Sequence, residues 1–132
     1  MNIKDFAEKF IKAEEEAFQK GNFDALAKLE DTNVVYHMGA PLGDLVGHEA
    51  HRHYITGARQ TVSNLKQEFK YLAGDGNLFA FAYKSSGQIT GEISGVPMPI
   101  GKKVSTDYLF VIRVNKGRVA EVWANGSTTI SD

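Results

Sequence analysis

The sequence predicts one cone-shaped α+β domain, in which N-terminal helices pack on a curved antiparallel sheet and enclose an apolar pocket. Two patterns predict it: apolar residues recur at three-and-four spacing up to about position 62, and alternate with polar residues beyond Ser63. Helices followed by a run of strands are typical of α+β domains with helices on one sheet face. The length of 132 residues fits a single domain over 1–132.

Apolar residues at helical spacing predict three helices before position 63. The first covers 2–20 and ends at Gly21, because glycine adopts the left-handed cap conformation at little cost. A short second helix is predicted over 22–29 and a third over 48–62.

Strands are predicted where β-branched and aromatic residues gather or alternate. The first covers 33–38, and the three glycines and one proline of 39–47 predict a loop after it. The later strands are separated by glycine-bearing turns at 74–76 and 115–117, and by a strand end and wide turn over 87–103. These later strands cover 65–72, 78–84, 104–114 and 118–125.

The composition excludes several classes of function. A net charge of −1 provides no basic face, so we expect neither a nucleic-acid partner nor an anionic membrane surface. No apolar run approaches the roughly 18 residues of a membrane span, and the first ten residues lack a signal-peptide core, so a cytoplasmic protein is expected. The chain has no cysteine, Walker loop, dinucleotide fingerprint or Gly-x-Ser-x-Gly elbow, so no cofactor is expected.

Glu14 stands in the middle of the apolar stripe of the first helix. It lies three or four residues from Phe10, Ile11, Ala17 and Phe18. An apolar interior disfavours the charged carboxylate and raises its pKa, which makes Glu14 a candidate general acid or base. The alternative is a structural glutamate that pairs with an arginine or reaches solvent through a gap in the packing.

His37 is a candidate second proton carrier. It ends a predicted strand beside a glycine-rich loop, a common place for pocket residues, and imidazole titrates near neutral pH. Strand alternation places His37 with Val35, opposite Tyr36 and Met38, but six residues do not tell which face is inner. The alternative is a partly exposed histidine at a strand end.

The segment His48-Glu-Ala-His-Arg-His53 does not predict a metal site. The metalloprotease pattern needs a second histidine four residues after the first, and that position is Arg52. His48 and His51 share a helix face, but two ligands without a carboxylate nearby make a poor site. We therefore expect a solvated helix face and no metal.

The most apolar face of strand 104–114 predicts the pocket lining. Thr106, Tyr108, Phe110 and Ile112 share that face, while Asp107 points to the other side. Trp123 and Asn125 alternate along the last strand, so we expect them to face the same cavity. Simple core packing is the alternative for all the residues of this predicted lining. The predicted lining residues are Phe18, Tyr54, Tyr108, Phe110, Ile112, Trp123 and Asn125.

Several stretches resemble the SnoaL-like polyketide cyclases, within the superfamily of nuclear transport factor two. The similarity runs from about Ala7 to Ser127, and its most specific part is the hairpin pattern Arg-x-x-x-Gly-Arg-Val-x-Glu-x-Trp that ends at Trp123. It implies the cystatin-like cone fold, a pocket between sheet and helices, a homodimer built across the sheet, and no organic cofactor. The other matching stretches are Gly21-Asn-Phe-Asp-Ala-Leu, Val35-Tyr-His-Met, Val46-Gly-His-Glu-Ala and the glycine- and proline-rich 90–104.

The chain departs from the residues that the resemblance would supply for catalysis. The cyclases are expected to have a histidine before the hairpin arginine and an aspartate after the tryptophan, where this chain has Ile112 and Asn125. Ile89 stands where many members have a histidine. The related ketosteroid isomerases have an acid donor at the position of Phe110 and a tyrosine at that of Glu14. His37 matches a histidine common in the family.

The leading hypothesis is a small-molecule enzyme that applies general acid–base catalysis to a compact apolar carbonyl or enol. Glu14 and His37 would carry protons, and Tyr108 and Asn125 would stabilise an oxyanion. The alternative is a non-catalytic ligand-binding or assembly domain. The two differ in one feature: an acid–base site holds two titratable groups with separated pKa values in its pocket, and a binding domain does not. A third possibility, hydrolysis of an epoxide or ester, needs a second acid near Glu14.

The opposite face of strand 104–114 is also apolar. Leu109 and Val111 point away from the predicted pocket, so they are candidates for the surface of a homodimer formed through the sheet.

Overall fold

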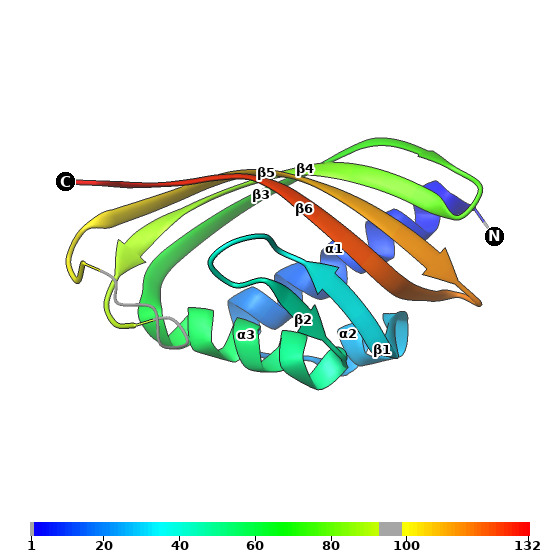
Figure 1. Cartoon of the computed structure of the whole chain (residues 1–132), viewed down its shortest axis with the longest axis horizontal. Coiled ribbons are helices and arrows are strands. Elements are labelled where there is room, and N and C mark those ends of the chain that lie inside the picture. Colours follow the sequence, from blue (N-terminus) through cyan, green and yellow to red (C-terminus); the bar gives the residue numbers. More distant parts are fainter. Residues whose placement is uncertain (1, 93–98) are drawn as a thin grey trace.

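The computed structural model describes residues 2–92 and 99–132, and it confirms the predicted α+β cone (Figure 1). A curved sheet arches over helices that lie on one of its faces. The wide turn predicted over 87–103 lies partly outside the described residues. The elements in order are α1 Ile3–Lys20, α2 Asp24–Leu29, β1 Glu30–His37, β2 Asp44–Val46, α3 His48–Thr61, β3 Val62–Asp75, β4 Leu78–Ile89, β5 Lys103–Asn115 and β6 Arg118–Ser131.

Helix α1 begins and ends with side-chain and backbone caps. The side chain of Asn2 accepts hydrogen bonds from the backbone N–H groups of Lys4 and Asp5, at 3.0 and 3.2 Å. Gly21 ends the helix in the left-handed region with a φ of 68°, as its sequence position predicts. These caps fix where α1 begins and ends, and the helix packs with one buried stripe toward the sheet.

The strand order β2-β1-β6-β5-β4-β3 makes a six-stranded sheet. The predicted antiparallel sheet is mixed, because β1 pairs with β6 in the parallel direction while the other neighbours are antiparallel. A parallel pair needs a long crossover, and the chain from β2 to β5 provides it. The predicted loop 39–47 also contains β2, and β1 begins at Glu30 instead of residue 33.

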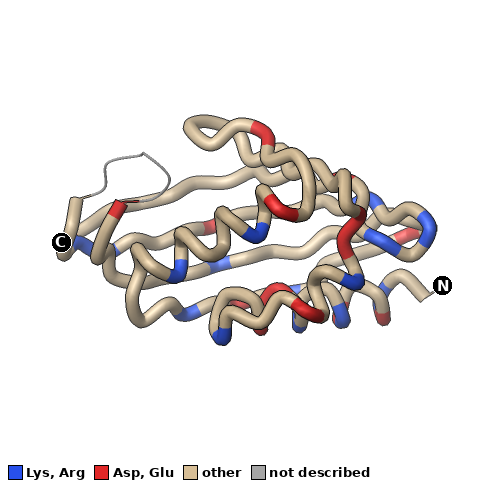
Figure 2. Tube along the Cα trace, turned by 90° about the horizontal axis from the view of Figure 1, so that it is seen from below, with Lys and Arg blue, Asp and Glu red and all other residues tan. Residues whose placement is uncertain are grey.

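The core lies between α1 and the inner face of the sheet. Phe10 packs edge-on against Phe79, with ring centroids 6.1 Å apart, and Phe81 lies close to both. Charges of both signs are distributed along the helices and the strands (Figure 2). No helix of the described residues has the length and hydropathy needed to cross a membrane.

Candidate functional site

A mostly apolar cavity of about 360 Å³ lies between the sheet and helices α1 and α3. Its volume is in the range of small-molecule sites. A larger hollow of about 520 Å³ lies on the outer sheet face, but polar side chains such as Lys66, Lys84 and Asp107 line it, so it lacks the apolar character of a ligand pocket. The inner cavity is lined by Phe10, Glu14, Phe18, Tyr36, Met38, Ala40, Pro41, Leu42, His51, Tyr54, Ala58, Val62, Leu65, Phe69, Phe81, Tyr83, Ser85, Val104, Thr106, Tyr108, Phe110, Val122, Thr128 and Ile130.

Glu14 projects from α1 into the wall of this cavity, between Phe10 and Phe18. Its residue exposure is 7 %. The arginine of the alternative interpretation is not its partner: among the described residues, the charged side chains closest to Glu14 are His51 and Glu30.

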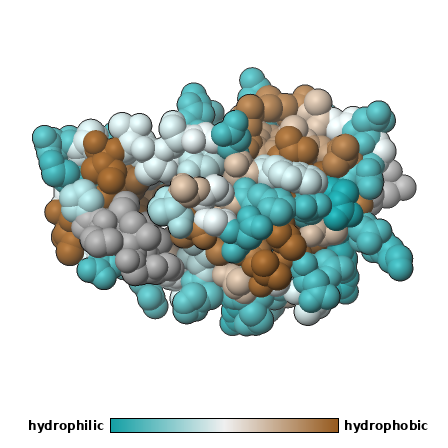
Figure 3. Space-filling view, viewed as in Figure 1, coloured by the Kyte–Doolittle hydropathy of each residue, from teal (hydrophilic) through white to brown (hydrophobic). Residues whose placement is uncertain are grey.

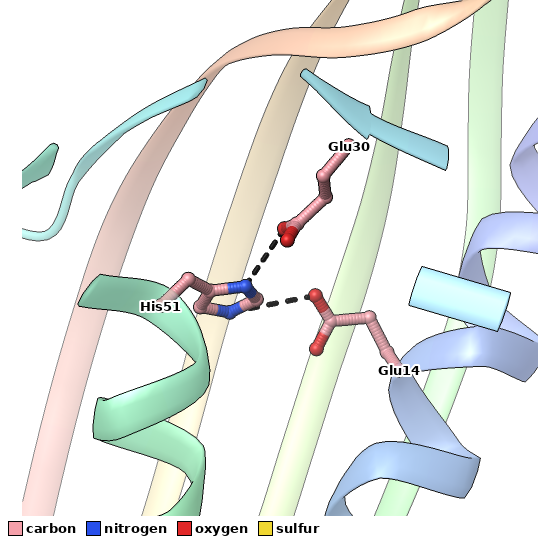
Figure 4. A group of neighbouring side chains, drawn as sticks. All are labelled: Glu14, Glu30 and His51. Atoms are coloured by element: carbon pink, nitrogen blue, oxygen red, sulfur yellow. Dashed lines mark ion pairs between the residues drawn. The ribbon is translucent and has the colours of Figure 1, made fainter. Parts of the chain in front are cut away.

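Four further polar side chains meet Glu14 at one end of the cavity. His51 lies between two carboxylates, with Nε2 at 3.6 Å from Glu14 Oε1 and Nδ1 at 2.7 Å from Glu30 Oε2 (Figure 4). The second contact is an ion pair whose angle is too bent for a straight hydrogen bond. Tyr36 donates its hydroxyl to Glu30 and lies 3.4 Å from Glu14, and His48 Nδ1 lies 2.6 Å from Glu30 Oε1.

The environment separates the pKa values of the two carboxyl groups. Burial is the main cause that raises the pKa of Glu14 from 4.5 to about 7, and the nearby charge of Glu30 adds to it, against the opposing effect of His51 and Tyr36. Burial also acts to raise the pKa of Glu30. The charge and close approach of His51, together with hydrogen bonds from Tyr36 and His48, outweigh burial, so the pKa of Glu30 is lowered.

The carboxylates of Glu14 and Glu30 also raise the pKa values of the His51 and Tyr36 side chains. Burial alone would lower the pKa of His51, but the charges of Glu30 and Glu14 raise it overall. Burial and the two glutamates raise the pKa of Tyr36 well above its ordinary value, so the phenol keeps its proton. The Tyr36 and His51 rings stack with centroids 3.9 Å apart, which fixes both orientations.

Hydroxyl groups occupy another part of the cavity wall. Burial raises the pKa of Tyr54 to about 12, with smaller contributions from Tyr83, Tyr108 and Glu14. Tyr83 accepts a hydrogen bond from Gln67 at 2.7 Å. Tyr54 therefore keeps its proton as a donor on the cavity wall, and the hydroxyl-bearing side chain of Tyr108 lines the same cavity.

His37 lies on the opposite side of the sheet and not in the cavity. Burial alternates along β1, so Val34 and Tyr36 face inward and His37 faces outward. Its imidazole contacts Asp44 at 3.0 Å and Glu121 at 2.7 Å, and the hydrogen bonds to Glu121 and then to Asp44 raise its pKa. The prediction that His37 shares the pocket with Glu14 was wrong.

Trp123, Asn125 and Ile112 are also not lining residues. Trp123 pairs with Val111 and Asn125 with Leu109 across β5 and β6. Directly opposite residues share a sheet face. Because Leu109 and Val111 face outward, Trp123 and Asn125 do as well, and both are exposed. Ile112 is on the inner face but is buried in the core beyond the cavity.

The predicted solvated histidine face was wrong for two of its members. His51 is 4 % exposed and the side chain of His48 is 14 % exposed, because Glu30 binds both from the other side. Possible ligand atoms of Glu14, Glu30 and His51 lie within 4.8 Å of one another, close enough for one cation. The imidazole pairs with both carboxylates.

Sequence reasoning missed Glu30 and Tyr36 for different reasons. Glu30 follows the short helix α2 beside Asp31, which is the usual pattern of a solvated helix end. In the structure Glu30 begins β1, and strand alternation then places it on the inner face with Val34 and Tyr36. The alternation of β1 was recognised in the sequence, so a decision on its inner face would have identified Tyr36.

A buried acid of raised pKa beside an ionised carboxylate and an imidazole can move protons to and from a ligand in the cavity. The comparisons with known proteins agree with a small-molecule binding fold. The family model for SnoaL-like polyketide cyclase matches residues 8–126. A search of curated protein sequences found no significant match.

Solved structures with the same fold have low sequence identity to this chain. TsrD from Streptomyces laurentii has a TM-score of 0.78 at 20% identity, covering 93% of this chain and 89% of its own. IdmH from Streptomyces antibioticus has a TM-score of 0.73 at 22% identity, with coverages of 96% and 93%. SalBIII has a TM-score of 0.72 at 15% identity, with 98% of both chains covered. It is described as an epoxide hydrolase/cyclase-like enzyme with a role in pyran ring formation in the polyether salinomycin. The family match over residues 8–126 confirms the resemblance seen in the sequence motifs, and the chain belongs to the SnoaL-like polyketide cyclase family.

Proposed function

We propose that this protein is an enzyme that applies general acid–base catalysis to a compact apolar carbonyl or enol compound. Glu14 is the acid or base. The observation that carries the proposal is the position of its carboxyl group in the wall of an apolar cavity, with a pKa raised to about 7. A group with this pKa exists in both protonation states near neutral pH, which suits proton transfer in either direction.

The neighbouring groups support a division of roles. Glu14 takes a proton from the carbon next to the carbonyl, and the negative charge that develops on the carbonyl oxygen is stabilised by a hydroxyl donor. Tyr54 and Tyr108 line the same cavity, and the raised pKa of Tyr54 keeps its proton available for that hydrogen bond. His51 contacts both glutamates and does not leave either carboxylate unpaired.

A second candidate function is the opening of an epoxide ring. It needs a second acid near Glu14, and Glu30 is that group: both carboxylates contact the His51 ring. SalBIII, which has the same fold, is described as epoxide hydrolase/cyclase-like. Asp107, the second acid considered from the sequence, is exposed on the outer face. Glu30 does not line the cavity, so we rank this function below proton transfer next to a carbonyl.

The test uses 2-tetralone, a bicyclic ketone with acidic protons next to its carbonyl. We expect the protein to catalyse exchange of these protons in D₂O, measured by NMR, and Glu14→Gln to lower the rate at least about a hundredfold. The rate should rise with pH through about 7, because Glu14 acts as a base only when ionised. Glu15→Gln, an exposed neighbour on α1, should leave the rate unchanged.

Affinity separates catalysis from binding. We expect 2-naphthol, which resembles the enol of 2-tetralone, to bind the wild type and Glu14→Gln with nearly equal affinity, as measured by its fluorescence. Binding of both compounds without any exchange by the wild type would contradict the enzyme and support the ligand-binding domain. Exchange that persists in Glu14→Gln would show that another group is the base.

A further inference from the structure

Two groups of the buried cluster have no role in the proton transfer next to a carbonyl that is proposed above. Glu30 and His48 do not line the cavity, so neither can touch a ligand that fills it. The side chain of Glu30 is completely buried, yet three donors converge on its carboxylate: His48, His51 and Tyr36. Moving this charge out of water is costly. The Tyr36 hydroxyl lies between this carboxylate and that of Glu14.

These side chains form a continuous path from the cavity to the other side of the cluster. Glu14 Oε1 lies 3.4 Å from the hydroxyl of Tyr36, which hydrogen bonds to Oε2 of Glu30. The other carboxylate oxygen of Glu30, Oε1, lies 2.6 Å from Nδ1 of His48. The side chain of His48 is 14 % exposed and is the only member of the path outside the cavity wall that reaches solvent.

We propose that Tyr36, Glu30 and His48 form a proton relay that connects Glu14 to solvent when a ligand fills the cavity. The inference rests on the proposed role of Glu14 in proton transfer. An apolar ligand displaces water from the cavity side of Glu14, since aromatic and aliphatic side chains make up most of that wall. The relay reaches solvent on the side of the cluster away from the cavity, at His48 in the first turn of α3, where the ligand does not block it.

Each transfer breaks one bond to hydrogen and forms another. Glu14 gives the proton that it took from the ligand to the oxygen of Tyr36, while Tyr36 gives its own proton to Oε2 of Glu30. Once Glu30 is protonated, its charge no longer holds the Nδ1–H of His48, and the ring changes by exchange with water to its Nε2–H tautomer. The Glu30 carboxyl group then turns about its terminal carbon–carbon bond and passes the proton to the free Nδ1 of His48. Nε2 of His48 then releases one proton to water, so one proton leaves for each one taken from the ligand.

His51 holds the relay in register and is not a link in it. Its ring stacks on Tyr36 and pairs with both carboxylates, which keeps the Tyr36 hydroxyl between Glu14 and Glu30. The 3.4 Å between Glu14 and the hydroxyl is at the long end for a hydrogen bond. Such contacts often shorten only when the ligand is bound.

The test measures the exchange of the Tyr36 hydroxyl proton with water. This proton is buried in a hydrogen bond to the Glu30 carboxylate and should give a separate NMR signal, assigned by its loss in Tyr36→Phe. With 2-naphthol filling the cavity, saturation transfer from water gives the exchange rate. We expect His48→Gln to slow it at least about tenfold, because glutamine donates the same hydrogen bond to Glu30 but does not carry protons.

Two controls separate a relay from a structural effect. His53→Gln makes the same change at an exposed position of α3 and should not alter the rate. In His48→Ala, added imidazole should restore fast exchange, which repair of packing alone would not do. An unchanged rate in His48→Gln, or slowing without rescue by imidazole, would overturn the relay. The measurement needs no turnover of 2-tetralone, so a failure of the proposed reaction is recognised separately.

Discussion

The two faces of the sheet each carry a histidine between two carboxylates. On the inner face, His51 lies 2.7 Å from Glu30 and 3.6 Å from Glu14, and its side chain is 5% exposed. On the outer face, His37 lies 2.7 Å from Glu121 and 3.0 Å from Asp44, and its side chain is 32% exposed. The residue types and distances are alike, so what distinguishes the two clusters is their access to water.

Burial reverses the direction of the pKa shift at Glu14 but not at Glu30, where three neighbouring groups outweigh it. Outside, the hydrogen bond from His37 is the main cause that lowers the pKa of Glu121, the usual behaviour of an ion pair. Inside, burial dominates at Glu14 and raises its pKa to about 7, although it has a similar imidazole partner. Water screens the outer charges. A histidine with two acids therefore has a carboxyl group of raised pKa only on the side where the fold removes solvent.

The largest expected effect comes from removing the carboxylate of Glu30. We expect Glu30→Ala to lower the free energy of unfolding by roughly 3–5 kcal/mol, because it leaves His51, Tyr36 and His48 without their common partner in a buried site. Urea denaturation followed by circular dichroism measures it. Asp44→Ala makes the matched change beside His37 and should have little effect, since Asp44 is exposed. Equal losses in both variants would show that burial does not distinguish the clusters.

A smaller and pH-dependent effect is expected for Glu14→Gln. The unfolded state loses the Glu14 proton near 4.5, while the folded state keeps it up to about 7, so ionisation weakens the wild type as pH rises through that window. Glutamine resembles the protonated acid and avoids this loss. The variant should therefore gain stability relative to the wild type between these pH values, to at most about 3 kcal/mol above pH 7.

Denaturation series of both proteins from pH 4 to pH 9 would measure this difference. Glu15→Gln on the exposed side of α1 is the control and should follow the wild type at every pH. A difference between Glu14→Gln and the wild type that stays constant with pH would mean that Glu14 ionises normally and that the acid–base proposal lacks its basis.

The smallest effect on stability is expected for a substitution on the outer face of the sheet, where we propose that a second copy of the chain binds. Leu109, Val111 and Trp123 are all at least 40% exposed there, and Val111 pairs directly with Trp123. Apolar side chains reach the surface in separate groups among polar ones (Figure 3). Leu109→Lys should give a monomer of unchanged stability, measured by light scattering after gel filtration. Val46→Lys on the edge strand β2 is the control, and a wild type that is monomeric would contradict the proposal.

The sequence alone determined the features that depend on local periodicity. Glu14 was placed on the buried stripe because a helix repeats every 3.6 residues, and Gly21 was identified as the residue that ends α1. The inner placement of Tyr108 and Phe110 followed from the two-residue repeat of β5. Both rules apply within one element, so they need no knowledge of the rest of the chain.

Only the tertiary structure decided which residues complete the site. Alternation divides β1 into two faces but does not say which one the helices cover, so Tyr36 entered the cluster and His37 was left outside. The pairing with Val111 turned Trp123 outward in the same way. Glu30 and His51 reach Glu14 from elements far apart in sequence, and their meeting depends on how α1, β1 and α3 pack against one another. Such contacts leave no periodic signal, because they are set by the packing of whole elements and not by the spacing of residues within one.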